Sequence, residues 1–191
     1  MTGVLLAIRP KWCDLIASGQ KTVEIRKTRP KLKTPFKCYI YCTKLHPGDP
    51  DSMISLKDRT YFFMPKSSSV IGEFECDEIE WHGGSDLIVK EDREYATRGS
   101  CVSREELFDY LGIAPGFSAF DKKCEFFCWH ITKLKIYDKP RPLANFHRPC
   151  PESLYCESCA MHNEHPVPFC GNYALEIKRP PQSWCYAEEQ T

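Results

Sequence analysis

The sequence predicts an α+β fold that is mainly β, namely a small closed or partly closed β-barrel with short helices at its mouth. The chain has 191 residues, of which 42% are hydrophobic and 13% aromatic, and this composition is typical of a folded core. Segments with strand character do not alternate regularly with helical segments, which disfavours a doubly wound α/β fold. The length suits one domain or at most two small ones, and we predict a single domain over residues 1–191.

The chain opens with a predicted strand and a short helix. The apolar run VLLAI (4–8) is typical of a strand, and Pro10 follows at a position that the first turn of a helix tolerates. Three apolar residues then have the i, i+3, i+4 spacing of one helix face: Trp12, Leu15 and Ile16. Gly19 can end this amphipathic helix.

Two alternating segments follow and predict strands. In KTVEIR (21–26), Val23 and Ile25 point to one face, and the polar residues share the other: Thr22, Glu24 and Arg26. In FKCYIYCT (36–43), alternate apolar residues face one way, so Cys38 and Cys42 are predicted to lie in the core rather than to bind a metal.

The rest of the chain predicts a loop, three strands and one more helix. Residues 44–69 have little periodicity and are expected to form a loop. The three predicted strands are 70–81, a long bent strand at 124–137, and 173–178. Ser103 and Glu106 have the spacing of a capping box before REELFDYL, a helix that Gly112 can end.

The formal net charge is zero, but the charges are unevenly distributed along the chain. Residues 9–37 contain nine Lys or Arg against two acids, and residues 73–94 contain nine acids against two Lys or Arg. A concentrated cationic region is typical of a protein whose partner carries phosphates. An ordinary solvated surface is the alternative.

The N-terminus has too short an apolar run for a signal peptide, and no stretch approaches the roughly 18 apolar residues of a membrane helix. We therefore expect a cytoplasmic protein without a membrane partner. In a reducing compartment, the twelve cysteines are better interpreted as buried apolar residues and metal ligands than as a disulfide framework.

A proline-rich, Cys-rich insertion at 146–171 predicts a structural zinc ion. Four cysteines are spaced C-x5-C-x2-C-x10-C: Cys150, Cys156, Cys159 and Cys170. The C-x2-C pair can grip one tetrahedral ion, and two further ligands close the shell. All-Cys ligation is favoured over a histidine replacement, and free cysteines or a redox pair are the alternatives. A zinc loop of this kind could also be a docking surface for a protein partner.

Three histidines are isolated in the sequence: His46, His82 and His130. We interpret each of them as a satisfied polar residue rather than as a metal ligand.

The segment VLLAIRPKWCDLIASGQKTVEIRK, followed by VIGEF and FFCWHITKLKIYDKP, resembles the ASCH domain of the PUA-like superfamily. The resemblance is to the uncharacterised ASCH proteins of phages and Firmicutes-type bacteria that end in PPQSWCY, and it extends over most of the chain. It implies a PUA-like β-barrel with a cleft beside the first helix, lined by the GxKTxExR segment. It also implies binding of RNA or nucleotides.

This resemblance implies a set of ligand-binding residues: Lys11, Trp12, Lys21, Glu24, Arg26, Lys27, Arg29 and Trp184. Lys and Arg would contact phosphate or base, and Glu24 would orient a cation or a nucleobase amino group. Trp12, Trp129 and Trp184 could provide a stacking plane for an unpaired base. The alternative is that Glu24 is a simple ion-pair partner and that the tryptophans belong to the core.

A hydrolase is the second interpretation that the resemblance allows. A related bacterial ASCH protein is an amidohydrolase of acetylated cytidine that uses Lys, Thr and Glu, and other ASCH proteins have been proposed as ribonucleases. Lys21 matches the catalytic Lys, but Glu24 stands where the nucleophilic Thr would be. Thr22 is two strand residues away, a shift of about 7 Å that would misplace its hydroxyl. The catalytic candidates are therefore Lys21, Thr22 and Glu24, and binding is the favoured function.

Overall fold

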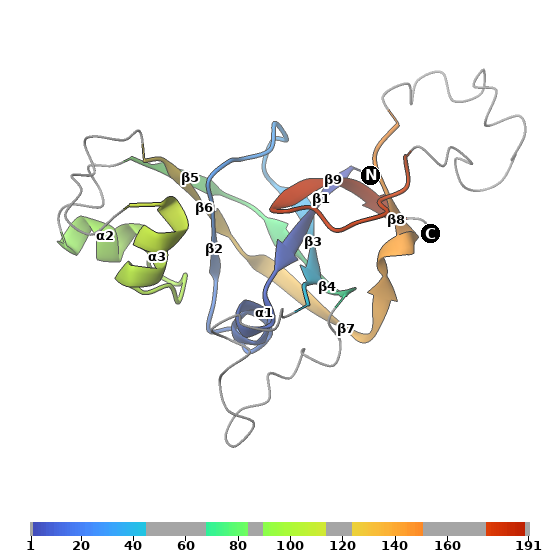
Figure 1. Cartoon of the computed structure of the whole chain (residues 1–191), viewed down its shortest axis with the longest axis horizontal. Helices are drawn as coiled ribbons and strands as arrows, with labels where there is room; N and C mark the ends of the chain where they lie inside the picture. The colour runs from blue at the N-terminus through green and yellow to red at the C-terminus, as the bar shows by residue number, and fades with distance from the viewer. Residues whose placement is uncertain (1, 45–67, 84–89, 114–123, 151–174, 190–191) are drawn as a thin grey trace, which may run out of the picture. The chain divides into compact units, whose positions relative to one another are not determined.

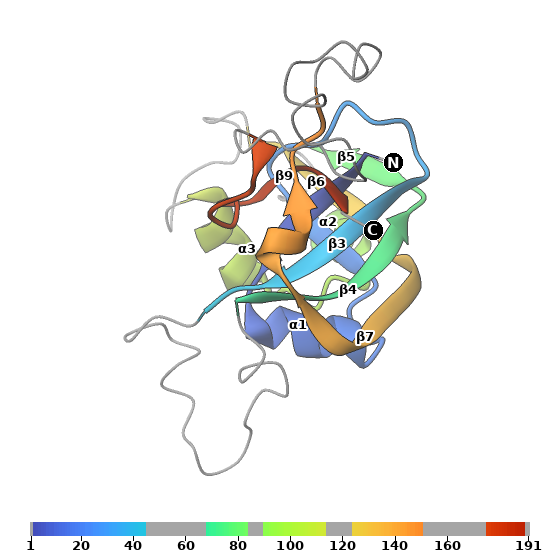
Figure 2. The ribbon, with the colours of Figure 1, turned by 90° about the vertical axis from the view of Figure 1, so that its right-hand side faces the viewer.

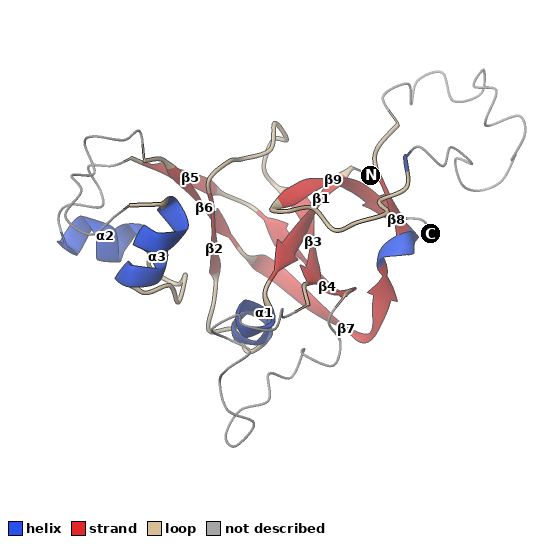
Figure 3. Cartoon of the chain, in the orientation of Figure 1, coloured by secondary structure: helices blue, strands red, loops and turns tan. Residues whose placement is uncertain are grey.

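The computed structural model describes residues 2–44, 68–83, 90–113, 124–150 and 175–189, with the helices and strands drawn in Figures 1 and 3. The chain divides into two compact units, each assembled from separate stretches of sequence. The first unit comprises Met1–Pro10, Lys37–Glu73 and Ile136–Thr191. The second comprises Lys11–Phe36 and Phe74–Lys135.

The first unit is built on a six-stranded sheet with the order β7-β4-β3-β1-β9-β8. Its strands are β1 (Gly3–Ile8), β3 (Phe36–Cys42), β4 (Ser69–Cys76), β7 (Thr132–Pro142), β8 (Phe146–His147) and β9 (Trp184–Glu189). Strand β1 pairs in parallel with β3 and antiparallel with β9, and Figure 2 shows β3 beside β4. A 3-10 helix, η4 (Leu143–Asn145), precedes β8.

Aromatic and aliphatic side chains fill the core of the first unit. The buried cluster contains Leu5, Tyr39, Tyr41, Val70, Tyr137, Phe146, Ile177 and Ala187. Tyr39 meets Phe146 edge to face, with ring centroids 4.9 Å apart. Burial, reinforced by the nearby Glu73 carboxylate, raises the pKa of Tyr39 to about 12. Tyr39 is therefore a neutral core residue at physiological pH.

The second unit contains a three-stranded antiparallel sheet with the order β2-β6-β5 and three helices. The strands are β2 (Val23–Arg26), β5 (Ile79–His82) and β6 (Phe126–His130), and the helices are α1 (Pro10–Ala17), α2 (Lys90–Ala96) and α3 (Arg104–Leu111). Alternate residues of β2 and β6 pack against α2 and α3, which lie beside β5 and β6 in Figure 1. This core contains Val23, Ile25, Ala96, Leu107, Ile113, Cys124, Phe126 and Cys128.

The capping box predicted for α3 is confirmed. The Ser103 hydroxyl accepts a hydrogen bond from the Glu106 backbone N–H at 3.2 Å, and the Glu106 carboxylate accepts one from the Ser103 N–H at 2.9 Å. Gly112 ends the helix in the left-handed conformation, with φ 74°. This local sequence signal thus fixes both ends of the helix.

Two strand predictions need correction because each covers two elements. The predicted strand 70–81 is wrong as one element, because β4 ends at Cys76 and β5 starts at Ile79 in the other sheet. The predicted strand 124–137 likewise divides at residue 131 into β6 and β7. Alternation continues through both segments, but it carries no information about which neighbour each half pairs with.

The prediction of a last strand at 173–178 is also wrong for its described part, which holds only an isolated bridge at Glu176. The last described strand is β9, because pairing with β1 starts at Trp184, opposite Leu6.

The mainly β fold class with short helices is confirmed. Helix α2 was not predicted. The single domain over 1–191 stays a prediction.

The three described α-helices have seven or eight residues each, far below the roughly 20 residues that crossing a bilayer requires. The cytoplasmic location stays a prediction.

Candidate functional site

Strand β2 orients the charged residues of the KTVEIR segment as the alternation predicted. Val23 and Ile25 lie in the core cluster, and Glu24 and Arg26 point to the other face of the sheet. However, this second face is covered as well. Lys21 is 2%, Glu24 7% and Arg26 6% exposed to solvent. The segment therefore places three charged side chains in the interior of the second unit.

Glu24 joins the two cations in one buried network. One carboxylate oxygen lies 2.9 Å from an Arg26 guanidinium nitrogen, and the other lies 3.3 Å from Lys21 Nζ. Two carboxylate oxygens are thereby shared between two cations, which leaves the network with a formal charge of +1. The ion pairing of Glu24, which was the alternative interpretation of the sequence, is present.

The Lys21 ammonium makes three polar contacts. It donates to the backbone carbonyl of Val23 at 2.8 Å and to that of Ser100 at 2.6 Å, and it contacts Glu24. An ammonium has three N–H donors, so these contacts match its full capacity. The side chain therefore ties β2 to the turn that follows α2.

Gly99 makes this turn fit against β2. Its carbonyl accepts hydrogen bonds from the N–H groups of Thr22 and Val23, at 2.8 and 3.1 Å. Its φ is +75°, and a Cβ on Gly99 would lie 2.3 Å from the Thr22 hydroxyl oxygen. Thr22 is exposed at this contact, and only glycine suits the position.

Cationic and aromatic side chains gather along one face of α3. Lys11 Nζ lies 2.5 Å from a Glu106 carboxylate oxygen and 4.5 Å from the centre of the Trp12 ring. Lys27 Nζ lies 5.0 Å from the centre of the Tyr110 ring. Because Glu106 and Tyr110 are four residues apart on the helix, they are neighbours on its surface. We call these five residues the α3 cation–aromatic surface.

The buried network lies next to this surface, since Lys21 Nζ is 5.1 Å from the centre of the Trp12 ring. Burial acts to raise the pKa of Glu106, but hydrogen bonds from Lys11 and Ser103 outweigh it and hold the pKa below its usual value. Because the folded pKa is lowered, these contacts stabilise the fold above about pH 4.3 and are lost as the pH falls further.

A search of curated proteins gives no significant match. The family model of the ASCH domain matches residues 6–62, a range that contains α1, β2 and β3. Over this range the chain is similar to the ASCH domain. The resemblance noted in the sequence is thereby confirmed. The phage or Firmicutes-type origin stays a prediction.

Solved ASCH structures show the same fold. The crystal structure of a tyrosine-to-phenylalanine mutant of ZmASCH from Zymomonas mobilis superposes with a TM-score of 0.53 at 16% sequence identity, over 98% of this chain and 91% of that one. A serine-to-alanine mutant of the same protein gives a TM-score of 0.49 at 17% identity, over 98% and 89% of the two chains. At such identities, the first match shows the fold alone.

Six of the eight sequence-predicted ligand residues lie together in the second unit: Lys11, Trp12, Lys21, Glu24, Arg26 and Lys27. Arg29 is exposed two residues beyond Lys27. Trp184 belongs to the first unit, where it meets Tyr186 edge to face.

Trp129 of the second unit is a core residue. It is fully buried, and its ring meets Phe36 edge to face at 5.9 Å between ring centroids. The suggestion that Trp129 provides a stacking plane is therefore wrong. Tyr110, which the sequence did not single out, is instead an exposed aromatic residue at the site, with 39% of its surface accessible.

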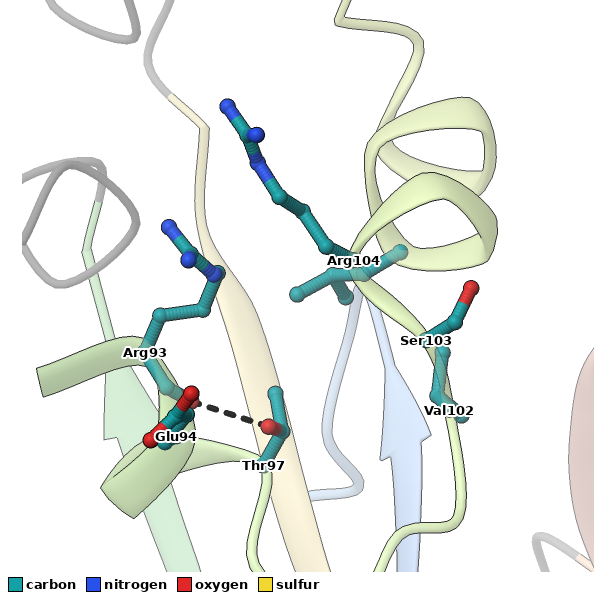
Figure 4. A pocket seen from close by; sticks show the side chains of 7 residues that line it. Arg93, Glu94, Thr97, Val102, Ser103 and Arg104 are labelled. Atoms are coloured by element: carbon teal, nitrogen blue, oxygen red, sulfur yellow. Dashed lines mark hydrogen bonds between the residues drawn. The ribbon is translucent and has the colours of Figure 1, made fainter. Parts of the chain in front are cut away.

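A small hollow of about 160 Å³ lies between α2 and α3 of the second unit (Figure 4). Its lining includes Arg93 and Arg104, whose side chains extend in the same direction in this view. Thr97 closes one side, and its hydroxyl donates to the Arg93 carbonyl at 2.9 Å. The sequence did not reveal this hollow because α2 was not predicted.

The predicted zinc ligands lie mostly outside the described residues. Cys150 is described and half-buried, whereas Cys156, Cys159 and Cys170 are not described. Among the described residues, one group of side chains could hold a metal ion: Glu78, Glu80 and His130. His130 is isolated in sequence, but strand pairing gives it two carboxylate neighbours.

Proposed function

We propose that this ASCH protein binds single-stranded RNA or a nucleotide through the α3 cation–aromatic surface, together with Arg29. The observation that carries the proposal is that Lys11 and Trp12 of α1, and Lys27 just after β2, gather beside Glu106 and Tyr110 of α3. Proteins that bind single strands combine cations, which follow the phosphates, with aromatic rings, on which bases stack. The surface offers both kinds of group within the second unit.

The buried network supports an anionic ligand. Lys21, Glu24 and Arg26 carry a formal charge of +1, and Lys21 lies 5.1 Å from the Trp12 ring. A cation held in a region of low dielectric acts over a longer distance than one in water. In this proposal, Lys21 and Arg26 attract phosphate through the field, and the exposed Lys27 and Arg29 contact it directly.

The same geometry favours binding over hydrolysis. Lys21 Nζ contacts two backbone carbonyls and Glu24, and these three contacts match the donor capacity of the side chain. The group is therefore engaged in holding β2 in place rather than directed at the hydroxyl of a nucleophile. Hydrolysis of acetylcytidine or of RNA with Thr22 as nucleophile is therefore not the function we propose.

Replacing Trp12 by alanine is expected to weaken the binding of a labelled oligouridine about tenfold, as measured by fluorescence anisotropy. Base stacking on an aromatic residue contributes about 1–3 kcal/mol, and 1.4 kcal/mol corresponds to a factor of about ten. Tyr110→Ala should have a similar effect. Trp81→Ala, which removes an exposed tryptophan from β5, is the matched control. Unchanged affinity in Trp12→Ala, or an equal loss in Trp81→Ala, would contradict the proposal.

We further propose that Cys150, Cys156, Cys159 and Cys170 hold one structural zinc ion, on the strength of their spacing. Protein purified without added zinc should contain about one zinc per chain by mass spectrometry, and Cys156→Ser with Cys159→Ser should lose it, since two thiolates are removed from a four-ligand shell. Cys101→Ser removes an exposed cysteine and should retain the ion. Full zinc content in the double variant would refute this assignment. Docking of a protein partner on this loop stays a prediction.

A further inference from the structure

Strand pairing brings four polar side chains together at the β5–β6 edge of the second unit. In the segment EIEWH, Glu78, Glu80 and His82 occupy alternate positions, so their side chains lie on one face of the chain. Strand β6 runs antiparallel to β5, with Glu80 opposite Cys128. In the same register His130 is opposite Glu78, and its N–H donates to the Glu78 carbonyl at 3.0 Å.

The donor atoms of this group are close to metal-ligand spacing. Glu80 Oε2 lies 3.6 Å from His130 Nε2, and Glu78 Oε2 lies 3.8 Å from the other ring nitrogen, Nδ1. Only one of these two nitrogens can bind a given ion. One donor atom from each of these three residues lies within 4.8 Å of the other two. Around a tetrahedral ion with bonds of about 2.0–2.1 Å, adjacent ligand atoms are roughly 3.4 Å apart. Rotation of the Glu78 and Glu80 side chains toward one His130 nitrogen would bring the three atoms to this spacing.

His82 supports the group from its buried side. Its Nε2 lies 3.5 Å from the same Glu80 oxygen that faces His130. The His82 ring is stacked on Phe126, with centroids 5.1 Å apart, which fixes its orientation. Such outer partners orient a ligating carboxylate and are a regular feature of metal sites.

The other side of the group is open to water. The side chains of Glu78, Glu80 and His130 are 62%, 34% and 32% exposed, so an ion can enter and keep water ligands. The surrounding sequence is acidic, with nine acids against two Lys or Arg between residues 73 and 94. This charge raises the local concentration of cations.

We propose that Glu78, Glu80 and His130 bind one divalent transition-metal ion, with His82 as the positioning residue for Glu80. A mixed set of imidazole and carboxylate ligands suits zinc, manganese, iron or cobalt, whereas magnesium and calcium prefer oxygen alone. The site is distinct from the predicted cysteine site. It also shares no residue with the α3 cation–aromatic surface of the RNA-binding proposal.

The test uses Mn²⁺ alone, because manganese favours carboxylate and imidazole over thiolate, so the cysteines do not compete for it. The full chain is stripped with a chelator and titrated with Mn²⁺, and free Mn²⁺ is followed by electron paramagnetic resonance. Wild type should bind one ion per chain. Glu80→Gln and His130→Ala should each bind at least about tenfold more weakly, and His82→Ala should show a smaller loss.

Glu105→Gln is the control, since it removes the same charge from an exposed position on α3. It should bind as wild type does. A second measurement avoids variants altogether: Mn²⁺ should broaden the imidazole NMR signals of His130 and His82. Wild-type affinity in both Glu80→Gln and His130→Ala would overturn the proposal, as would unbroadened His130 signals at saturating Mn²⁺.

Discussion

Replacing Glu24 by alanine is expected to lower the free energy of unfolding by about 3–5 kcal/mol, the cost of removing one partner from a buried ion pair. Glu24 is the carboxylate that Lys21 and Arg26 share, at 3.3 and 2.9 Å. Without it, two buried like charges remain side by side. Urea unfolding, followed by the fluorescence of the buried Trp129, measures the change.

Two controls separate this effect from a general loss of packing. Asp138→Ala removes an exposed acid from β7 and should change the stability by at most about 0.5 kcal/mol. The loss of unfolding free energy in the double variant Glu24→Ala with Arg26→Ala should be smaller than the sum of the losses in the two single variants. Residues of one network couple by about 0.5–3 kcal/mol. A loss below about 1 kcal/mol in Glu24→Ala, or strict additivity, would show that the carboxylate does not hold the network together.

The local features of the fold could be predicted from the sequence. The apolar run of β1, the alternation in VEIR and the capping box of α3 all depend on residues within a few positions of one another. For the same reason, Cys38 and Cys42 were correctly placed in the core. These signals need no knowledge of the partner strands.

The features that depend on distant partners could not be predicted. Alternation placed Glu24 and Arg26 on one face, but it did not indicate that this face is buried. Nor did it indicate that Ser100, 79 residues further on, contacts Lys21. The contact of Lys27 with Tyr110 joins residues 83 positions apart, and no local pattern indicates it. The group of Glu78, Glu80 and His130 likewise requires the register of β5 against β6.

Reversing Lys27 and Arg29 to glutamate is expected to weaken the binding of single-stranded RNA at least about tenfold. Both residues are exposed, and Lys27 lies over Tyr110 on the α3 cation–aromatic surface. For a single strand, each phosphate contact makes the slope of log K against log salt steeper by about 0.7. Loss of two contacts should therefore make the slope of the variant shallower by about 1.4. Lys135→Glu with Lys139→Glu makes the same change of charge at two exposed positions of β7 and should leave the slope unchanged.

The salt dependence of wild-type binding tests the proposed interface most directly. If Lys11, Lys27 and Arg29 contact three phosphates, the slope should be about −2, and the affinity for oligouridine should fall roughly 20-fold between about 50 and 200 mM salt. The affinity of the Lys27→Glu, Arg29→Glu variant should fall only a few fold over the same range. A wild-type slope near zero, or an equal slope in the wild type and in the Lys27→Glu, Arg29→Glu variant, would contradict binding of RNA through this surface.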